Sequence, residues 1–314
     1  MDVNVIYNSE CRLGLKCLPE NSVNCCITSP PYYGLRDYGN DEQIGLEATP
    51  EEYIGKLVEV FREVRRVLTN DGTLWVNIGD SYAGSMKGAA QFPDNAMNYK
   101  QGTNRGALGK ATLVKQCTNC KPKDLIGIPW MLAFALRADG WYLRQDIIWS
   151  KPNPMPESVR DRCTKSHEYI FLLSKSRLYY FDADAIKVPA RESTMRRIRQ
   201  DVDNQVGSSR TLKANGNMKA VIGGRKRNFS DMTEDDPMYR ASTNREYEYT
   251  DKANKRSVWV VSTSAFHGAH FAVFPPALIV DCIKAGCPED GVVLDPFMGS
   301  GTTATVSRKL NRNY

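Results

Sequence analysis

The spacing of apolar residues along the chain predicts strands that alternate with helices. Residues 23–28 (VNCCIT) form a short apolar run that predicts a buried strand, and two prolines shortly after it end the strand. Residues 50–68 repeat apolar side chains every three to four positions, which predicts an amphipathic helix. Thr49 before Pro50 is a typical start for that helix, because threonine caps a helix and proline favours its first turn.

The same patterns predict the remaining elements. We expect strands at residues 3–7, 73–78, 142–149, 169–173 and 292–294, and helices at residues 125–138, 274–285 and 303–310. Asn70-Asp71-Gly72 predicts a turn, and residues 83–122, rich in Gly, Asn, Lys and Gln, predict a long loop. Strands that alternate with helices predict an α/β fold with a mostly parallel sheet.

A polar, basic segment interrupts this alternation. Residues 187–227 contain 11 Lys or Arg and 3 Asp or Glu, a local net charge of +8, whereas the whole chain of 314 residues carries +6. We therefore predict an inserted module and a polyanionic partner, with a solvated basic loop as the alternative. The predicted division is residues 1–186, an insertion at residues 187–256, and residues 257–314.

Composition narrows the class of protein. The chain is 41% hydrophobic but has no apolar run of 18 residues, and its start has no signal-peptide pattern, so we expect no membrane span and a cytoplasmic location. Nine cysteines, an odd number, favour reduced thiols. Cys117 and Cys120 form half of a zinc site, for which Cys163 and His167 are only speculative partners, so we predict no metal.

A glycine turn between a strand and a helix is the first candidate binding element. Asp295-Pro296-Phe297-Met298-Gly299-Ser300-Gly301-Thr302-Thr303 follows the strand expected at residues 292–294 and opens the helix expected after it. Such a corner lets a ligand approach the backbone and presents free N–H groups. It lacks the Gly-Lys-Ser/Thr ending of a phosphate-binding loop, which disfavours a nucleotide triphosphatase. If this motif stood alone, an ordinary tight turn would be the favoured explanation.

The second candidate is Ser29-Pro30-Pro31-Tyr32, directly after the strand at residues 23–28. Ligands bind at strand ends in open α/β sheets. The prolines cannot donate hydrogen bonds, so this loop displays carbonyl oxygens as acceptors, with the Ser29 hydroxyl beside them and the Tyr32 ring as a flat surface. Acceptors next to an aromatic plane suit an amino group on a planar ring. A structural Pro-Pro turn would be the simpler explanation without the glycine loop.

Together the two motifs resemble the DNA methyltransferases that methylate cytosine N4 or adenine N6. Ser-Pro-Pro-Tyr resembles their catalytic tetrapeptide, and the sequence from Asp295 to Thr303 resembles their S-adenosylmethionine loop. The order of the motifs resembles the β-class, a circularly arranged variant. The resemblance therefore implies a Rossmann-like methyltransferase sheet in that order, with residues 187–256 as a target-recognition insertion.

The resemblance also implies roles for individual residues. The implied catalytic residues are Ser29, Pro30, Pro31 and Tyr32. The implied cofactor-binding residues are Glu10, His270, Phe271, Asp295, Pro296, Phe297, Gly299, Ser300, Gly301, Thr302 and Thr303. Residues 151–154 and 167–169 also resemble family segments. An acidic residue that holds the cofactor ribose in the family would be expected beyond Tyr314, so either the native chain continues or this contact is lost.

The implied chemistry is direct methyl transfer to an amino group in double-stranded DNA. Ser29 and the Pro30 carbonyl would accept hydrogen bonds from the amino group, Asp295 would attract the positive end of the cofactor, and the flipped base would stack on Tyr32. Methylation at cytosine C5 needs a Pro-Cys nucleophile, and no cysteine here follows a proline. In the family, serine at the first motif position favours cytosine N4 over adenine N6. An RNA or protein methyltransferase, or a DNA-binding regulator with a degenerate site, remain alternatives.

The predicted insertion supplies candidate DNA contacts. Its basic side chains could reach phosphates or guanine edges, although a solvated surface charge is the simpler explanation for each one taken alone. The candidates are Arg196, Arg197, Arg199, Arg225, Lys226 and Arg227. A cognate restriction endonuclease is an expected partner of such an enzyme.

Overall fold

The computed structural model describes residues 2–35, 42–84, 119–198, 251–263 and 274–314, with residues 197 and 198 as backbone only. The chain divides into two compact units. One contains residues 1–186 together with 256–314, and the other contains residues 187–255. The predicted roles of the three segments stay predictions.

Six strands of the first unit, within the described part of the chain, form one sheet in the order β7-β3-β4-β2-β1-β8. Their bounds are β1 Val23–Thr28, β2 Leu68–Ile78, β3 Tyr142–Ser150, β4 His167–Ser174, β7 Val258–Val260 and β8 Val293–Leu294. β1 runs parallel to β2 and β8, and β3 runs parallel to β7. β4 is antiparallel to both of its neighbours. The mostly parallel α/β sheet predicted from the sequence is confirmed.

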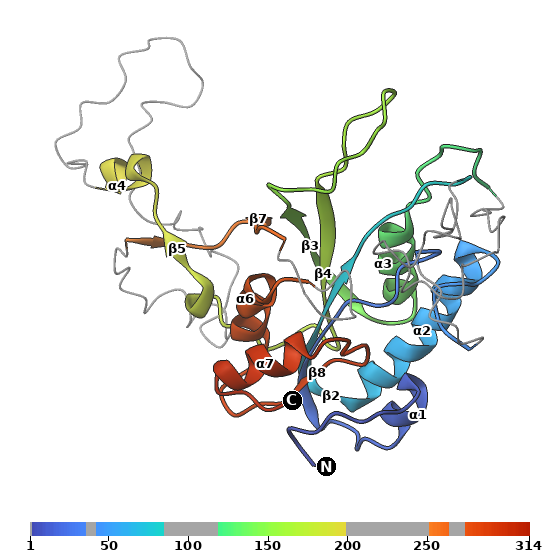
Figure 1. Ribbon diagram of the computed structural model, residues 1–314. Coiled ribbons are helices and arrows are strands. Elements are labelled where there is room, and N and C mark those ends of the chain that lie inside the picture. The colour runs from blue at the N-terminus through green and yellow to red at the C-terminus, as the bar shows by residue number, and fades with distance from the viewer. Residues whose placement is uncertain (1, 36–41, 85–118, 199–250, 264–273) are drawn as a thin grey trace, which may run out of the picture. The chain divides into compact units, whose positions relative to one another are not determined.

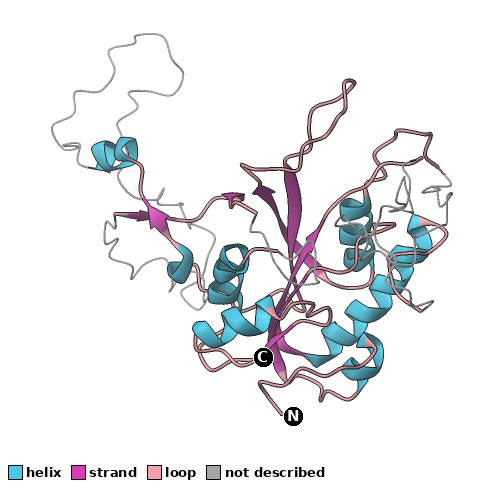
Figure 2. Cartoon of the chain, viewed as in Figure 1, coloured by secondary structure: helices cyan, strands magenta, loops and turns pink. Residues whose placement is uncertain are grey.

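Helices cover both faces of this sheet (Figures 1 and 2). The described helices of the first unit are α1 Cys11–Lys16, α2 Pro50–Val67, α3 Ile128–Ala138, the short 3-10 helix η4 Asp184–Ile186, α6 Pro276–Gly286 and α7 Thr302–Lys309. Alternate residues of a strand point to opposite faces, so Leu74 and Val76 pack with α2 and α3, whereas Trp75 between them packs with α6. β1 is a central strand buried on both faces, which explains why its sequence is an almost continuous apolar run.

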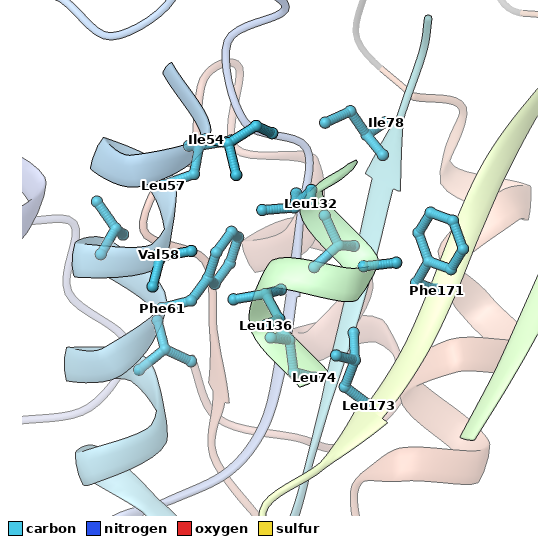
Figure 3. Packing of buried hydrophobic residues seen from close by; sticks show 14 of the residues in the cluster. Ile54, Leu57, Val58, Phe61, Leu74, Ile78, Leu132, Leu136, Phe171 and Leu173 are labelled. Atoms are coloured by element: carbon cyan, nitrogen blue, oxygen red, sulfur yellow. The ribbon is translucent and has the colours of Figure 1, made fainter. Parts of the chain in front are cut away.

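The core beneath α2 and α3 shows how the helical pattern is used (Figure 3). The apolar stripe of α2 faces the sheet, with α3 beside it. The labelled side chains are Ile54, Leu57, Val58 and Phe61 of α2, Leu132 and Leu136 of α3, and Leu74, Ile78, Phe171 and Leu173 of the sheet. Thr49 caps α2 by accepting a hydrogen bond from the Glu52 amide, 3.2 Å away, as its sequence predicted.

Three predicted elements differ from the structure. Residues 3–7 form no strand; Val5, Ile6 and Tyr7 line a cavity instead. The turn predicted at residues 70–72 lies inside β2, whose pairing with β1 shifts register there. The helix predicted from residue 125 begins at Ile128, because Gly127 before it adopts φ 84°.

Only a small part of the second unit lies within the described residues. The two-residue strands β5 Val188–Pro189 and β6 Lys252–Ala253 pair antiparallel. Helix α4 Glu192–Ile198 follows β5. The long predicted loop at residues 83–122 falls almost wholly outside the described residues.

Gly286 offers a test of how closely α6 packs against the sheet. A Cβ on Gly286, the last residue of α6, would lie 2.6 Å from Trp75 Nε1 and 2.7 Å from Thr73 Oγ1, both deeply buried. We expect Gly286→Ala to lower the free energy of unfolding by about 1–3 kcal/mol, the usual cost of overpacking a core. Urea denaturation measures this.

Gly55 is the matched control, because it lies within α2, is exposed, and a Cβ added to it would meet no atom within 4 Å. Gly55→Ala should raise the free energy of unfolding by about 0.5–1 kcal/mol, since alanine is the better helix former. Equal effects of the two substitutions would contradict the packing around Gly286.

Candidate active site

Two loops far apart in sequence leave the sheet side by side. β1 and β8 are parallel neighbours, with Cys25 opposite Val293 and Cys26 opposite Leu294. The loops that begin at Ser29 and at Asp295 therefore emerge at the same edge, where ligands bind in open α/β sheets. The structure thus brings the two sequence motifs together.

Asp295 joins these two loops. Its Oδ1 accepts hydrogen bonds from the Thr28 hydroxyl, 2.6 Å away, and from the Phe297 amide, 3.0 Å away. Its Oδ2 accepts one from the Thr303 hydroxyl at 2.7 Å. The buried carboxylate therefore ties the end of β1 to the glycine loop and to α7. Its predicted attraction for the positive end of a cofactor stays a prediction.

The glycine loop leads into α7 without a side chain that caps the helix. Gly299 and Gly301 have φ of 56° and 80°, a left-handed conformation that glycine adopts without strain. Gly301 precedes α7 and gives it no side-chain cap, so the first amides of the helix remain available to a ligand. The hydroxyls of Ser300 and Thr302 lie 3.1 Å apart beside them.

A cavity of about 610 Å³ opens in front of these loops. Three segments form its wall: the chain before and within α1, the loop after β1, and the loop after β8. The predicted residues in the wall are Glu10, Ser29, Pro30, Pro31, Tyr32, Asp295, Pro296, Phe297, Gly299, Ser300 and Thr302. The structure thus brings together at one cavity residues predicted for catalysis and for cofactor binding.

The other predicted residues lie elsewhere. Thr303 is buried behind the cavity, where it holds Asp295, and Gly301 precedes α7. His270 and Phe271 lie outside the described residues. The cavity wall also includes residues that the motifs did not indicate, among them Val5, Ile6, Tyr7, Phe274 and Tyr314. The exposed apolar residues near the start of the chain were the available signal, but their pattern was interpreted as a strand.

Glu10 has a structural task besides lining the cavity. It caps α1, because its Oε2 accepts a hydrogen bond from the Leu13 amide at 3.0 Å, and its Oε1 accepts one from Arg12 Nε at 2.9 Å. Partial burial favours a higher pKa for Glu10, but the hydrogen bonds from Arg12 and Leu13 outweigh it and hold the pKa below its usual value. The carboxylate therefore remains charged at the cavity wall.

The two proline carbonyls of the tetrapeptide differ in their hydrogen bonding. The Pro31 carbonyl accepts a hydrogen bond from the Tyr53 hydroxyl of α2, 2.7 Å away. Among the described residues the Pro30 carbonyl has no hydrogen-bond partner, although Pro30 is buried and lines the cavity. An acceptor held beside a cavity without a protein partner is suited to bind a donor on a ligand.

The basic residues of the second unit are only partly described. Arg196, on α4, is exposed and pairs with Glu192 at 3.0 Å. An exposed pair of this spacing contributes only about 0.3–0.5 kcal/mol, so the guanidinium can exchange this partner for a phosphate. Arg197 is described as backbone only, and Arg199, Arg225, Lys226 and Arg227 lie outside the described residues.

The cysteines do not assemble a metal site in the described residues, where no three His, Cys, Asp or Glu side chains are grouped suitably. Cys120 is disulfide-bonded, which corrects the expectation of reduced thiols at that position and removes it as a thiolate ligand. Cys117 lies outside the described residues. Cys163 is an exposed free thiol, and His167 packs edge-on against Tyr169.

Comparison with known proteins identifies the family. The family model described as DNA methylase, of the N6 and N4 methyltransferases, matches residues 23–314. The type II methyltransferase M.SmaI of Serratia marcescens is 43% identical over 311 residues, which cover 98% of this chain and 83% of that protein. M.Cfr9I of Citrobacter freundii, also a type II methyltransferase, is 43% identical over 313 residues, covering 98% and 81%.

A solved structure shares the fold. The PvuII DNA methyltransferase (cytosine-N4-specific) aligns with a TM-score of 0.57 at 16% identity, covering 98% of this chain and 78% of that one. The chain belongs to the DNA methylase family: it is a type II DNA methyltransferase of the N4/N6 group and uses S-adenosylmethionine. No helix in the described ranges is long and apolar enough to cross a membrane.

Proposed function

We propose that this methyltransferase transfers the methyl group to the exocyclic N4 amino group of cytosine in double-stranded DNA, directly and on a flipped base. The observation that carries the proposal is the shared cavity: Ser29 and Pro30 line the same space as the loop from Asp295 to Thr302. A methyl acceptor held by the first pair would therefore lie next to a methyl donor held by the second loop.

The cavity suits S-adenosylmethionine. Its volume of about 610 Å³ is within the range of pockets for small ligands, and apolar side chains such as Val5, Leu15 and Phe297 offer surfaces for an adenine ring. The start of α7 and the Glu10 carboxylate offer polar contacts. We propose that these residues hold the cofactor, which supplies an electrophilic methyl group when bound.

Ser29 and Pro30 would activate the amino group of the base. Its nitrogen is a poor nucleophile because its lone pair is delocalised into the ring. The Pro30 carbonyl has no protein partner in the described residues. It and the Ser29 hydroxyl would accept hydrogen bonds from the two N–H groups of the base. Both acceptors stabilise the positive charge that develops on nitrogen as the methyl group is transferred. No covalent enzyme intermediate is needed.

The target amino group is paired inside a duplex, so the base must leave the helix before it can reach this cavity. Tyr32, in the cavity wall, would stack on the flipped base. Residues 187–256 would recognise the DNA sequence, with Arg196 as one phosphate contact. We further propose action in the cytoplasm beside a cognate restriction endonuclease, in keeping with the type II relatives.

Nucleoside analysis tests the choice of base. Duplex DNA methylated by the pure protein with labelled S-adenosylmethionine would be digested, and its nucleosides separated. We expect the label in N4-methyldeoxycytidine, because Ser29 occupies the first position of the tetrapeptide. Label in N6-methyldeoxyadenosine would mean that adenine, not cytosine, is the methylated base. Label in RNA or protein substrates alone would overturn the proposal.

A further inference from the structure

A cluster of polar side chains lies behind Tyr32 at the edge of the sheet. Its members come from four separate places in the sequence: Tyr32 follows β1, Asn77 belongs to β2, Lys151 follows β3, and Glu168 belongs to β4. Glu168 and Lys151 expose only 17% of their side chains. Burying polar and charged groups costs free energy unless they are paired, so a cluster like this one needs an explanation.

Glu168 is the centre of the cluster. Its Oε2 accepts hydrogen bonds from the Tyr32 hydroxyl at 2.7 Å and from Asn77 Nδ2 at 3.2 Å. Its Oε1 is paired with Lys151 Nζ. Asn77 also donates to the Tyr169 carbonyl, 3.1 Å away, which fixes the amide itself. The carboxylate is thus held from several sides and in turn holds the tyrosine hydroxyl.

The ring of Tyr32 is confined on a second side. A Cβ on Gly79, just after β2, would lie 2.7 Å from Tyr32 Cε2, so the glycine backbone is packed against the ring. Burial, followed by the charge of Glu168, raises the pKa of Tyr32 well above its usual range. The hydroxyl therefore stays protonated and donates to Glu168 throughout the ordinary pH range.

Stability alone does not explain these contacts. A buried ion pair is often no more stabilising than apolar residues of similar volume. A hydrogen bond to a fixed carboxylate does provide direction: the long axis of the ring is held at Cβ by the backbone and at the hydroxyl by Glu168. The close packing of Gly79 against Cε2 restricts rotation of the ring about that axis. The restricted ring belongs to the cavity wall.

We infer that Glu168, itself held by Lys151 and Asn77, is a positioning residue that orients the Tyr32 ring for stacking against the flipped base. The inference rests on the proposed function, because it requires a base that enters the cavity. Holding the ring in advance lowers the cost of ordering it when the base arrives. Glu168 acts through the tyrosine hydroxyl and touches neither base nor cofactor.

A double-mutant cycle in the full-length chain tests this role. Glu168→Gln keeps the shape of the side chain but removes the charge that pairs with Lys151. We expect it to lower kcat by roughly ten- to a hundredfold, with the KM for the cofactor nearly unchanged, as for a misplaced reacting group. In the Tyr32→Phe background, Glu168→Gln should have little further effect on kcat, because the hydroxyl through which it acts is gone.

A fluorescent base supplies a readout that a structural role would not move. In a duplex with 2-aminopurine at the methylated position, stacking on Tyr32 should quench the flipped base in the wild type. The Glu168→Gln complex should be brighter and show a longer lifetime. Glu157→Gln is the matched control: Glu157 pairs with Arg162 in the β3–β4 connection and does not contact Tyr32. It should leave kcat and fluorescence unchanged.

Two outcomes would overturn the inference. One is the same fall in kcat for Glu168→Gln with and without the tyrosine hydroxyl; the other is a lower melting temperature with unchanged fluorescence. Failure of the proposed function looks different, because it appears in the wild type itself: no label would enter N4-methyldeoxycytidine, and binding of the duplex would give no fluorescence change.

Discussion

Replacing Ser29 by alanine is expected to slow methyl transfer by roughly 10²–10³-fold, the usual effect of removing one group that stabilises charge in a transition state. Ser29 lies in the cavity wall and is only half-buried, so its loss should disturb neither the sheet nor the glycine loop. Binding of cofactor and DNA should therefore stay within a few-fold of the wild type. Single-turnover methylation and cofactor titration measure the two quantities separately.

Ser22 is a suitable control for this substitution. It lies just before β1, at the opposite end of the strand, and donates a hydrogen bond to the Pro19 carbonyl at 2.7 Å. Ser22→Ala should cost about 0.5–1.5 kcal/mol of stability and leave the rate unchanged. If Ser29→Ala weakened cofactor binding as much as it slowed methylation, Ser29 would be a binding residue and its assigned role would be wrong.

Replacing Asp295 by alanine is expected to lower the free energy of unfolding by roughly 3 kcal/mol or more and to abolish cofactor binding. The substitution leaves the hydroxyls of Thr28 and Thr303 and the amide of Phe297 without their common acceptor. Each unsatisfied buried group costs about 1–3 kcal/mol. The glycine loop would also lose its connection to β1, which is the reason to expect the binding defect.

Urea denaturation and cofactor titration measure the two effects. Asp71→Ala is the control, because Asp71 lies exposed on β2, far from the glycine loop in sequence. It should change stability by less than about 0.5 kcal/mol. Normal cofactor binding by Asp295→Ala would contradict the role of the carboxylate in holding the loop.

The raised pKa of the Asp295 carboxyl group predicts that the stability of the protein depends on pH. Burial raises the pKa of Asp295 from 3.8 to about 6, although the hydrogen bonds from Thr28, Thr303 and the Phe297 amide oppose the shift. Between these two values the folded state binds the proton more tightly than the unfolded state does. The contribution of Asp295 to stability therefore falls as pH rises from about 4 to about 6, by roughly 3 kcal/mol in total.

Comparison with Asp295→Asn isolates this contribution, because the other titrating groups are common to both proteins. The difference in free energy of unfolding between the two should change in favour of the variant between pH 4 and pH 7. A difference that stays constant over this range would mean that the carboxyl group titrates with an ordinary pKa in the folded protein.

Elements whose local pattern admits one structure were predictable from the sequence. The apolar run of β1 and the helical spacing of α2, with its threonine cap, predicted nearly the observed bounds. The pattern failed at residues 3–7, because a short, mainly apolar run predicts a strand wherever it occurs, whereas a strand also needs a neighbouring strand with which to form a ladder of hydrogen bonds. In the structure the apolar side chains of this segment line the cavity instead.

The sequence by itself determined which local groups are candidates for the chemistry: the acceptors of the tetrapeptide and the glycine turn that opens a helix. Both depend on residue types over a few positions, where steric and hydrogen-bonding preferences are local. Only the tertiary structure decided which of these groups meet. Thr28 reaches Asp295 across 267 positions, and Tyr32 reaches Glu168 across 136. Such contacts follow from strand order in the sheet, which depends on the packing of the whole core.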